Sequence, residues 1–341
     1  MSKKEVKQEK NKIIFKYQKE NVNEKLVKIL GDDFRKYRDE FNKVQDYQKT
    51  KFIPEFPLAV SLELINRCNL NCIMCFKPHH KKPKAELSLK TIEKILAECK
   101  ENKLPSMILG LGSETLIYKD VLQVLDMVRQ ANIQDVFFGT NGVLLNDEII
   151  KLIIKNKISR VEISIDAATA EIYNKVRRVP VFNQVEANVK KLVEYKKKLS
   201  SPLPIIRLCF VVMDINKHES EQFIEKWQNQ VDYIDFQRFI DHSYVDKLKK
   251  LDTAEEKGIK DAFCSYPFYS LNIWANGDVS PCCTYYGKDL VLGNIHQQSL
   301  KELWQSQQIK TIRKQIVDKR FNLICKNCLY FRDRDIIEKN F

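Results

Sequence analysis

The sequence of 341 residues lacks long apolar runs. Its first twelve residues, MSKKEVKQEKNK, contain no apolar core, so we expect no secretory signal. No later run reaches the roughly 18 apolar residues that a membrane span needs. Internal repeats and low-complexity linkers are absent as well. These absences predict a cytoplasmic protein without a membrane partner.

The composition indicates a folded chain with a dispersed positive charge. Hydrophobic residues make up 44% of the sequence, which is enough for a sizeable core and excludes disorder over most of the chain. The 58 Lys and Arg against 45 Asp and Glu give a net charge of +13, but the basic residues are not gathered into one stripe. We therefore predict a solvated surface and no nucleic-acid partner. The length suggests about two domains, or one large α/β barrel.

Ten cysteines are the most informative feature of the composition. In the reducing cytoplasm that we expect for this chain, paired structural disulfides are rare. Cysteines that cluster in the sequence therefore indicate metal or iron–sulfur ligation.

Residues 1–55 have the periodicity of helices and no strand signal. Gly31 followed by Asp32 is typical of one helix ending and another beginning. We therefore predict an N-terminal helical extension over 1–55. Its apolar positions recur at steps of three and four, at Val22, Leu26, Ile29, Leu30, Phe34, Tyr37, Phe41 and Val44.

From Pro57 onward, short β-branched runs alternate with amphipathic helical segments, which is typical of βα units and a parallel sheet. The predicted strands are Leu58 to Ile65, Ser106 to Leu111, Ile133 to Gly139, Arg160 to Asp166, Pro204 to Met213 and Tyr233 to Arg238. The predicted helices are Leu89 to Glu101 after the N-cap Ser88, Val121 to Gln130, Asp147 to Ile154, Asn183 to Lys197 and Glu219 to Gln228. We predict an α/β fold: a partial (β/α)6 TIM-like barrel over 56–240, followed by a small C-terminal cluster-binding domain over 241–341.

Polar residues alternate with apolar ones along several predicted strands. In the fourth strand Glu162, Ser164 and Asp166 share one side, and Val161, Ile163 and Ile165 share the other. A polar side chain inside a barrel is costly unless it is used, so we expect a polar lumen suited to a hydroxylated small-molecule substrate. The same alternation points further residues inward, namely Glu63, Arg207, Asp235 and Gln237.

A cysteine-rich loop follows the first predicted strand. Cys68, Cys72 and Cys75 are spaced as Cys-x3-Cys-x2-Cys. Three thiolates on a loop this short can bind three irons of a [4Fe–4S] cube and leave the fourth iron open for chemistry. A closed zinc site with His79 as the fourth ligand is the alternative. The loop follows the first barrel strand, which favours catalysis over a structural metal.

The loop and the strands around it resemble the radical S-adenosylmethionine (SAM) enzymes. In that family three cysteines hold the cluster, and SAM chelates the open iron. The resemblance implies cofactor contacts after successive strands, at Gly112, Ser113 and Glu114, at Thr140 and Asn141, at Ser164, and at Arg177 and Arg178. The loop residues Met74 and Phe76 complete this set, with Met74 at a position where the family often has an aromatic residue against adenine.

A second cysteine group lies near the C-terminus. Cys264, Cys282, Cys325 and Cys328 supply four thiolates, a full set for zinc or for a closed iron–sulfur cluster. Their spacing, Cys-x12-Gly-x4-Cys with a later Cys-x2-Cys, resembles the shortened "twitch" form of the SPASM module of radical enzymes. The resemblance implies one auxiliary [4Fe–4S] cluster. The remaining cysteines are expected to pack in the interior, with Cys283 beside the ligand Cys282, Cys99 on a helix face and Cys209 within a strand.

The family resemblance implies a radical reaction. A one-electron donor such as flavodoxin or ferredoxin reduces the cluster, and the reduced cluster cleaves SAM. The 5′-deoxyadenosyl radical that forms abstracts hydrogen from the substrate. The chain is similar to aminocyclitol dehydrogenases, so we expect oxidation of a secondary alcohol of a sugar, sugar nucleotide or cyclitol, with the auxiliary cluster accepting the second electron. The candidates for the group that handles the hydroxyl proton are Arg207, Glu63 and Glu162.

Two other functions stay open. A peptide-modifying radical enzyme, such as a maturase of ribosomal peptides, is the nearer one, although such enzymes often carry a leader-binding domain of mixed strand and helix. Residues 1–55 are short and have no strand signal, which disfavours that function. A zinc-stabilised nucleic-acid-binding protein is the alternative from another class, suggested by Cys-x2-Cys and the basic pI of about 9.1.

Overall fold

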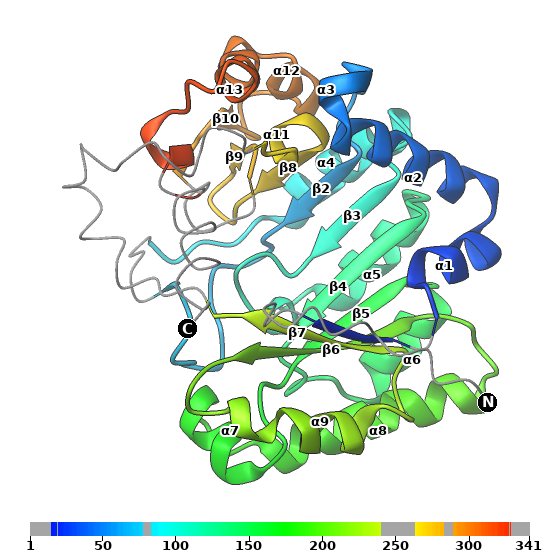
Figure 1. Ribbon diagram of the computed structural model, residues 1–341. Coiled ribbons are helices and arrows are strands. Elements are labelled where there is room, and N and C mark those ends of the chain that lie inside the picture. The colour runs from blue at the N-terminus through cyan, green and yellow to red at the C-terminus, as the bar shows by residue number, and fades with distance from the viewer. Residues whose placement is uncertain are drawn as a thin grey trace.

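The computed structural model describes residues 15–18, 20–77, 83–239, 263–282, 289–326 and 328. Its core is a ten-stranded sheet in the order β1-β7-β6-β5-β4-β3-β2-β8-β9-β10 (Figure 1). Six neighbouring strands of this sheet are parallel and follow one another in sequence: β2 (Ala59–Leu62), β3 (Ser106–Leu109), β4 (Asp135–Thr140), β5 (Arg160–Ser164), β6 (Ile205–Val212) and β7 (Tyr233–Arg238). These are the six predicted strands, and their open order confirms a partial barrel.

Helices connect the parallel strands. They are α4 (Leu89–Glu101), α5 (Val121–Gln130), α6 (Asp147–Lys155), α7 (Ala170–Arg177), α8 (Phe182–Lys198) and α9 (Ser220–Trp227), together with the short 3-10 helices η2 (Thr115–Ile117) and η3 (Lys217–Glu219). The helix α4 shows why the sequence predicted most of them. Ser88 accepts the N–H of Thr91 at 3.1 Å, and the helix buries a stripe of apolar residues that includes Cys99. The expected packing of Cys99 in the core is confirmed.

The N-terminal extension is not strandless as predicted. The helices α1 (Val22–Leu30), α2 (Asp32–Gln45) and α3 (Tyr47–Thr50) are present, with Gly31 at φ +82° between the first two. They are preceded by β1 (Phe15–Gln18), which pairs antiparallel with β7. Four residues are too few for an alternating pattern to stand out. This pairing provides hydrogen-bond partners for the backbone groups at one edge of β7 that would otherwise stay exposed.

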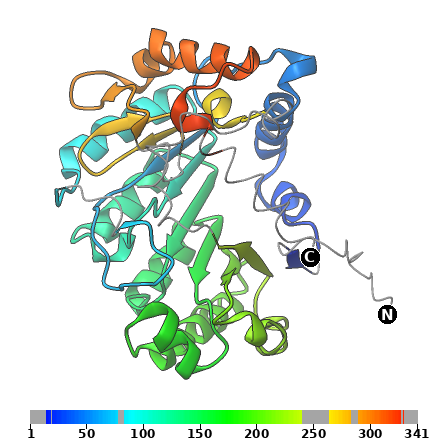
Figure 2. The same ribbon diagram turned by 60° about the vertical axis from the view of Figure 1, so that its left-hand side comes forward.

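The extension lies at the amino ends of the parallel strands. Lys25 of α1 bonds to Asp232, just before β7, at 2.9 Å, and Phe34 of α2 lies 6.0 Å from the guanidinium of Arg160, the first residue of β5. Figures 1 and 2 show α1 and α2 along one side of the sheet, with α3 near the C-terminal helices. The amino end of a barrel is the end at which residues serve stability, whereas active sites lie at the carboxyl end.

The C-terminal part continues the same sheet. After α11 (Tyr266–Tyr269), β8 (Ser270–Ile273) pairs parallel with β2, and β9 (Asp278–Ser280) and β10 (Gly293–Asn294) add antiparallel strands. The helices α12 (Leu300–Trp304) and α13 (Gln307–Val317) follow. The division into 1–55, 56–240 and 241–341 stays a prediction, and hydrogen bonding runs across both of its boundaries. Within the described residues, no helix is both long and apolar enough to cross a membrane.

Candidate functional site

A cavity of about 270 Å³ lies at the carboxyl ends of the parallel strands. The loop after β2 and the ends of β3, β4 and β5 supply most of its wall, as expected for an active site of this barrel class. The predicted site residues that line it are Cys68, Cys72, Met74, Cys75, Phe76, Gly112, Ser113, Glu114, Thr140, Asn141, Glu162, Ser164 and Arg177. The structure therefore brings together the predicted cluster loop and nearly all predicted cofactor contacts.

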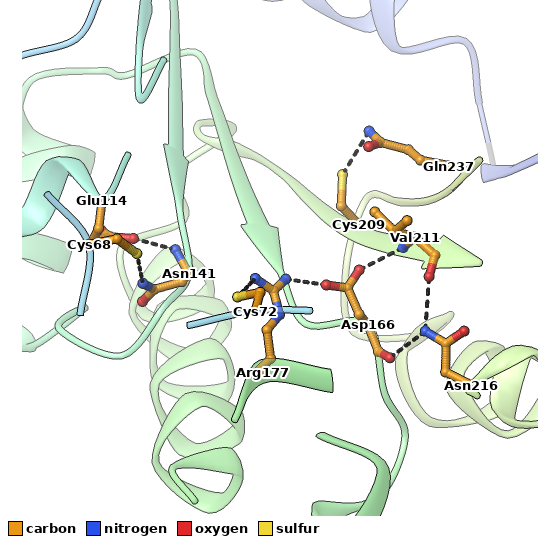
Figure 3. A network of polar contacts seen from close by, with 10 residues as sticks. All are labelled: Cys68, Cys72, Glu114, Asn141, Asp166, Arg177, Cys209, Val211, Asn216 and Gln237. Atoms are coloured by element: carbon orange, nitrogen blue, oxygen red, sulfur yellow. Dashed lines mark hydrogen bonds and ion pairs between the residues drawn. The ribbon is translucent and has the colours of Figure 1, made fainter. Parts of the chain in front are cut away.

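Each sulfur of the cysteine loop receives an N–H donor, and Figure 3 shows those of Cys68 and Cys72. The Asn141 amide lies 3.8 Å from the Cys68 sulfur, the Arg177 guanidinium 3.3 Å from that of Cys72, and the Lys77 backbone N–H 3.5 Å from that of Cys75. Burial raises the pKa of the Cys68 and Cys75 thiols. Thiolates at these positions therefore need a positive partner such as iron, which also fits donors aimed at the sulfurs.

The geometry of the loop fits a cluster better than a single ion. Among the described residues, no three Cys, His, Asp or Glu side chains converge closely enough to hold one metal ion. A cuboidal cluster offers each thiolate its own iron, so its ligands do not have to meet at one point. His79, the fourth ligand of the zinc alternative, lies outside the described residues.

Glu114 connects two turns of the cavity wall through hydrogen bonds. Its side chain is buried, its Oε1 accepts from the Thr140 hydroxyl at 2.8 Å and the Leu116 N–H at 3.1 Å, and its Oε2 accepts from the Asn141 N–H at 2.7 Å. Burial raises the pKa of this carboxyl, although the three donors oppose the rise. Asn141 in turn reaches Cys68, so Glu114 connects the turns after β3 and β4 with the cluster loop. The contact with the cofactor that the family resemblance implies for Glu114 stays a prediction.

The two arginines that were predicted together lie in different surroundings. Arg177, at the end of α7, is buried, and its guanidinium forms an ion pair with Asp166. Burial alone would lower the pKa of Arg177, but Asp166 and Cys72 outweigh it and raise that pKa. Arg178 is exposed, has φ +61° and does not line the cavity. Of the pair, the structure brings Arg177 alone into the site.

Glu162, which lines the cavity, belongs to an ionic group with Arg207 and Asp235. Arg207 contacts Glu162 at 2.6 Å and also pairs with Asp235. Burial lowers the pKa of Arg207, but Glu162 and further neighbours outweigh it, so the net shift is upward. Arg207 is therefore a paired cation, which disfavours it as the group that handles the hydroxyl proton; that role stays a prediction. Glu162 still lines the cavity.

Glu63 connects the end of β2 with the C-terminal part of the chain. It is buried, its Oε2 accepts the N–H of Ala275 at 3.1 Å, and the cavity lining does not include it. It therefore joins the end of β2 to the turn after β8. This placement disfavours Glu63 as the group that handles a substrate proton.

Two further lining residues, Lys77 and Cys209, were not among the predicted site residues. Lys77 follows the cysteine loop, and its ammonium donates to the Asn66 carbonyl at 2.7 Å. Cys209 is buried within β6, as predicted, and it also lines the cavity and accepts from the Gln237 amide at 3.4 Å. Its alternation with Arg207 along β6 was the signal that could have placed it in the lumen.

The C-terminal cysteines lie in partly enclosed surroundings. Cys282 is buried, and Cys264, Cys325 and Cys328 are half-buried. Burial, with smaller contributions from Cys264 and Cys282, raises the pKa of Cys325 to about 12. Three thiols that influence one another in this way fit a site that binds them as thiolates to the separate irons of a cluster. Cys283 lies outside the described residues.

Comparison with known protein families assigns both cysteine groups. The model of the radical SAM superfamily matches residues 62–225, and that of the SPASM iron–sulfur cluster-binding domain matches residues 264–329. The chain carries a radical SAM domain and a SPASM domain. These domains indicate SAM and [4Fe–4S] clusters as its cofactors, in place of the zinc alternatives. The assignment of individual ligands stays a prediction.

Several curated proteins resemble the radical SAM domain. A "Tungsten-containing aldehyde ferredoxin oxidoreductase cofactor-modifying protein" of Pyrococcus furiosus is 26% identical over 319 residues, covering 79% of this chain and 84% of that protein. A "Probable GTP 3′,8-cyclase" of Methanocaldococcus jannaschii is 26% identical over 168 residues, or 49% of this chain and 54% of the cyclase. The mycofactocin maturase of Mycobacterium ulcerans is 31% identical over 121 residues, or 36% of this chain and 32% of the maturase. The chain thus spans about half the length of the cyclase.

Solved structures of radical SAM proteins share the fold. SuiB of Streptococcus suis, bound to its precursor peptide SuiA, has a TM-score of 0.56 and 17% identity over 82% of this chain and 71% of SuiB. The protein anSMEcpe with bound SAM has a TM-score of 0.58 and 18% identity over 76% of this chain and 84% of that chain. At these identities the structures show a shared fold, and the comparisons give no specific support to the resemblance to aminocyclitol dehydrogenases.

Proposed function

We propose that this radical SAM enzyme is a maturase that modifies a peptide. The main observation is that the cavity belongs to an open sheet, whose order runs from β1 to β10 without closing. An open barrel leaves a lateral entrance to its lumen, which suits a segment of a longer chain. The similarity to the mycofactocin maturase, at 31% identity over 121 residues, supports this choice over alcohol oxidation.

The cavity residues divide into groups with separate tasks. Cys68, Cys72 and Cys75 would hold the first cluster. The turn at Glu114 and the strand end at Ser164 would hold SAM. With the cluster and SAM both bound, cleavage of SAM would supply the hydrogen-abstracting chemistry. The second cluster would be held by the SPASM cysteines, namely Cys264, Cys282, Cys325 and Cys328. A one-electron donor such as flavodoxin or ferredoxin would supply the reducing equivalent.

The lumen offers neutral polar groups beside charges that are already paired. Asp166 is paired with Arg177, and Glu162 with Arg207. Ser164 and Gln237 line the same cavity with a hydroxyl and an amide. Neutral donors and acceptors of this kind match the amide groups of a peptide backbone without having to desolvate a free charge.

Oxidation of a secondary alcohol on a sugar, sugar nucleotide or cyclitol is the second candidate. It is favoured by Glu162, a carboxylate in the cavity wall that Arg207 holds at 2.6 Å. A carboxylate in this position can accept a hydroxyl proton as hydrogen leaves the carbinol carbon.

Deuterium transfer distinguishes the two candidates. The reconstituted enzyme would be incubated anaerobically with SAM, dithionite and deuterated peptides encoded by the neighbouring genes. In parallel, it would receive cyclitols and sugar nucleotides deuterated at their carbinol carbons. The proposal predicts label in 5′-deoxyadenosine from a peptide, together with a mass change of that peptide. Label from a carbinol carbon with formation of a ketone would establish the second candidate instead.

A further inference from the structure

The Cys72 sulfur has a charged hydrogen-bond donor. The Arg177 Nη1 lies 3.3 Å from it, whereas Cys68 faces a neutral amide at 3.8 Å and Cys75 a backbone N–H at 3.5 Å. Hydrogen bonds from a cationic donor are stronger than those from neutral donors. The three cluster cysteines are therefore electrostatically unequal.

Asp166 fixes the orientation of this guanidinium. It lies just after β5, is fully buried and pairs with Arg177, as Figure 3 shows. Its Oδ1 accepts the N–H of Val211 at 2.6 Å, and its carbonyl accepts from the Asn216 amide at 2.9 Å. Asp166 is thus held from β6, from the loop after β6 and from α7.

The backbone of Asp166 is strained. Its φ of +64° lies in the left-handed region, which a residue other than glycine adopts at a cost. Such a conformation persists where surrounding contacts over-determine it, and it is often found at functional sites. Here it places a buried carboxylate behind the guanidinium that reaches the cluster loop.

We propose that Asp166 and Arg177 form a positioning pair that polarises the Cys72 sulfur and thereby raises the reduction potential of the radical SAM cluster. A donor to a cluster sulfur stabilises the reduced, more negative state. The pair carries no net charge, so its effect on the cluster arises from the guanidinium lying nearer to the sulfur than the carboxylate. In this role Arg177 acts on the cluster and is not the contact with SAM that the family resemblance implied.

The guanidinium retains one donor that could serve another group. Its Nε is buried and has no hydrogen-bond partner among the described residues. A direct contact with SAM is therefore the rival role, and an experiment has to measure the cluster and the affinity for SAM separately.

The test is a redox titration of the full-length, iron-loaded enzyme, monitored by electron paramagnetic resonance. The signal followed is the one that changes when SAM is added. The double variant Arg177→Gln with Asp166→Asn removes the cationic donor to Cys72 without leaving an unpaired buried charge. Arg177→Lys keeps the charge. Lys175→Gln is the matched control, because it removes one positive charge from the exposed face of the same helix.

The proposal predicts a more negative midpoint potential for the iron-replete double variant, an intermediate value for Arg177→Lys, and the wild-type value for Lys175→Gln. The affinity for SAM should be retained in all three. An unchanged potential with weakened SAM binding would overturn the proposal in favour of the contact with SAM. If the double variant loses its iron, Arg177→Lys decides the matter: a compact ammonium lacks the planar fork with which the guanidinium holds Asp166 and reaches Cys72 at once, so a wild-type potential there contradicts the proposal.

Discussion

At the scale of single residues, Glu114 shows how one buried carboxylate organises the cavity. Its oxygens accept from Thr140, Leu116 and Asn141, and Asn141 donates onward to Asn69 at 2.7 Å and to Cys68 at 3.8 Å. Loss of this carboxylate would free two turns of the wall at once. Because these turns lie where SAM is expected, binding of SAM should depend on it.

We predict that Glu114→Ala weakens SAM binding by roughly 1.5 to 3 kcal/mol, the range for one charge-assisted hydrogen bond, while the cluster iron is retained. Equilibrium binding of SAM to the iron-loaded protein measures this. Glu98→Ala is the control, because Glu98 also accepts two backbone N–H groups, those of Leu300 and Lys301, but does not line the cavity. Equal affinities of the Glu114 variant and the wild type would show that the role was assigned to the wrong residue.

Alternation along a strand predicts which side chains share a face and not which of them pair. It placed Glu162, Ser164, Asp166 and Gln237 in the lumen, and all four line the cavity. It gave no warning that Arg207 would be neutralised by two carboxylates, because those partners come from neighbouring strands. Pairing across a sheet depends on register, which one strand does not encode.

At the scale of elements, the extension is held to the barrel by a half-buried carboxylate, that of Asp232. Asp232 accepts from Lys25 of α1 at 2.9 Å, from Lys196 of α8 at 2.8 Å and from the N–H of Ile206 at 2.8 Å. Burial alone would raise the pKa of Asp232, but these three donors outweigh it and lower that pKa. The ionised form is therefore favoured in the fold.

We predict that Asp232→Asn lowers the stability at pH 7 by about 1 to 3 kcal/mol, the range for loss of hydrogen bonds to charged groups. The folded pKa lies below the unfolded value of about 4, so the stabilisation is complete above that pH and is lost as the pH falls through the folded pKa. The difference in the free energy of unfolding between wild type and variant, measured with urea from pH 7 to pH 3, should therefore become smaller below about pH 4. Asp214→Asn is the control, since that carboxylate also pairs with a lysine but is exposed. A difference that stays constant with pH would contradict this account.

The aromatic contact of α2 should matter as well. Phe34 is fully buried, packs edge-on against Tyr37 at 5.7 Å and lies beneath Arg160. We predict that Phe34→Ala lowers the free energy of unfolding by about 3 to 5 kcal/mol, as large truncations in cores do. Leu199→Ala, at a side chain that is 54% exposed, should change it by less than about 0.5 kcal/mol. Similar urea midpoints for both variants would mean that the extension does not stabilise the barrel.

Elements with strong periodicity or caps were predictable from the sequence, and short ones were not. The bounds of α4 and α5 match their predictions because a complete apolar stripe defines each helix. The helix α7 and the strand β1 went unpredicted. Four residues give β1 too little periodicity, and it exists through its pairing with the distant β7.

At the scale of the whole molecule, one continuous sheet carries both cysteine groups. The first group follows β2, and β8 of the SPASM part pairs directly with β2. Glu63 reinforces this junction by bonding to Ala275. The sequence predicted both cysteine groups from their spacing, but the direct pairing of β8 with β2 depends on a contact between segments more than two hundred residues apart, which local patterns do not report.

The central claim is that this chain holds two [4Fe–4S] clusters on separate sets of cysteines. The iron and sulfide content of anaerobically prepared protein tests it most directly. We predict about eight irons in the wild type and about four when Cys68, Cys72 and Cys75 are replaced together by Ala. The reciprocal variant, with Cys264, Cys282 and Cys325 replaced by Ala, should also keep about four irons, now in a cluster whose spectrum responds to SAM. Zinc in place of iron, or a triple variant that loses all or none of its iron, would contradict the account.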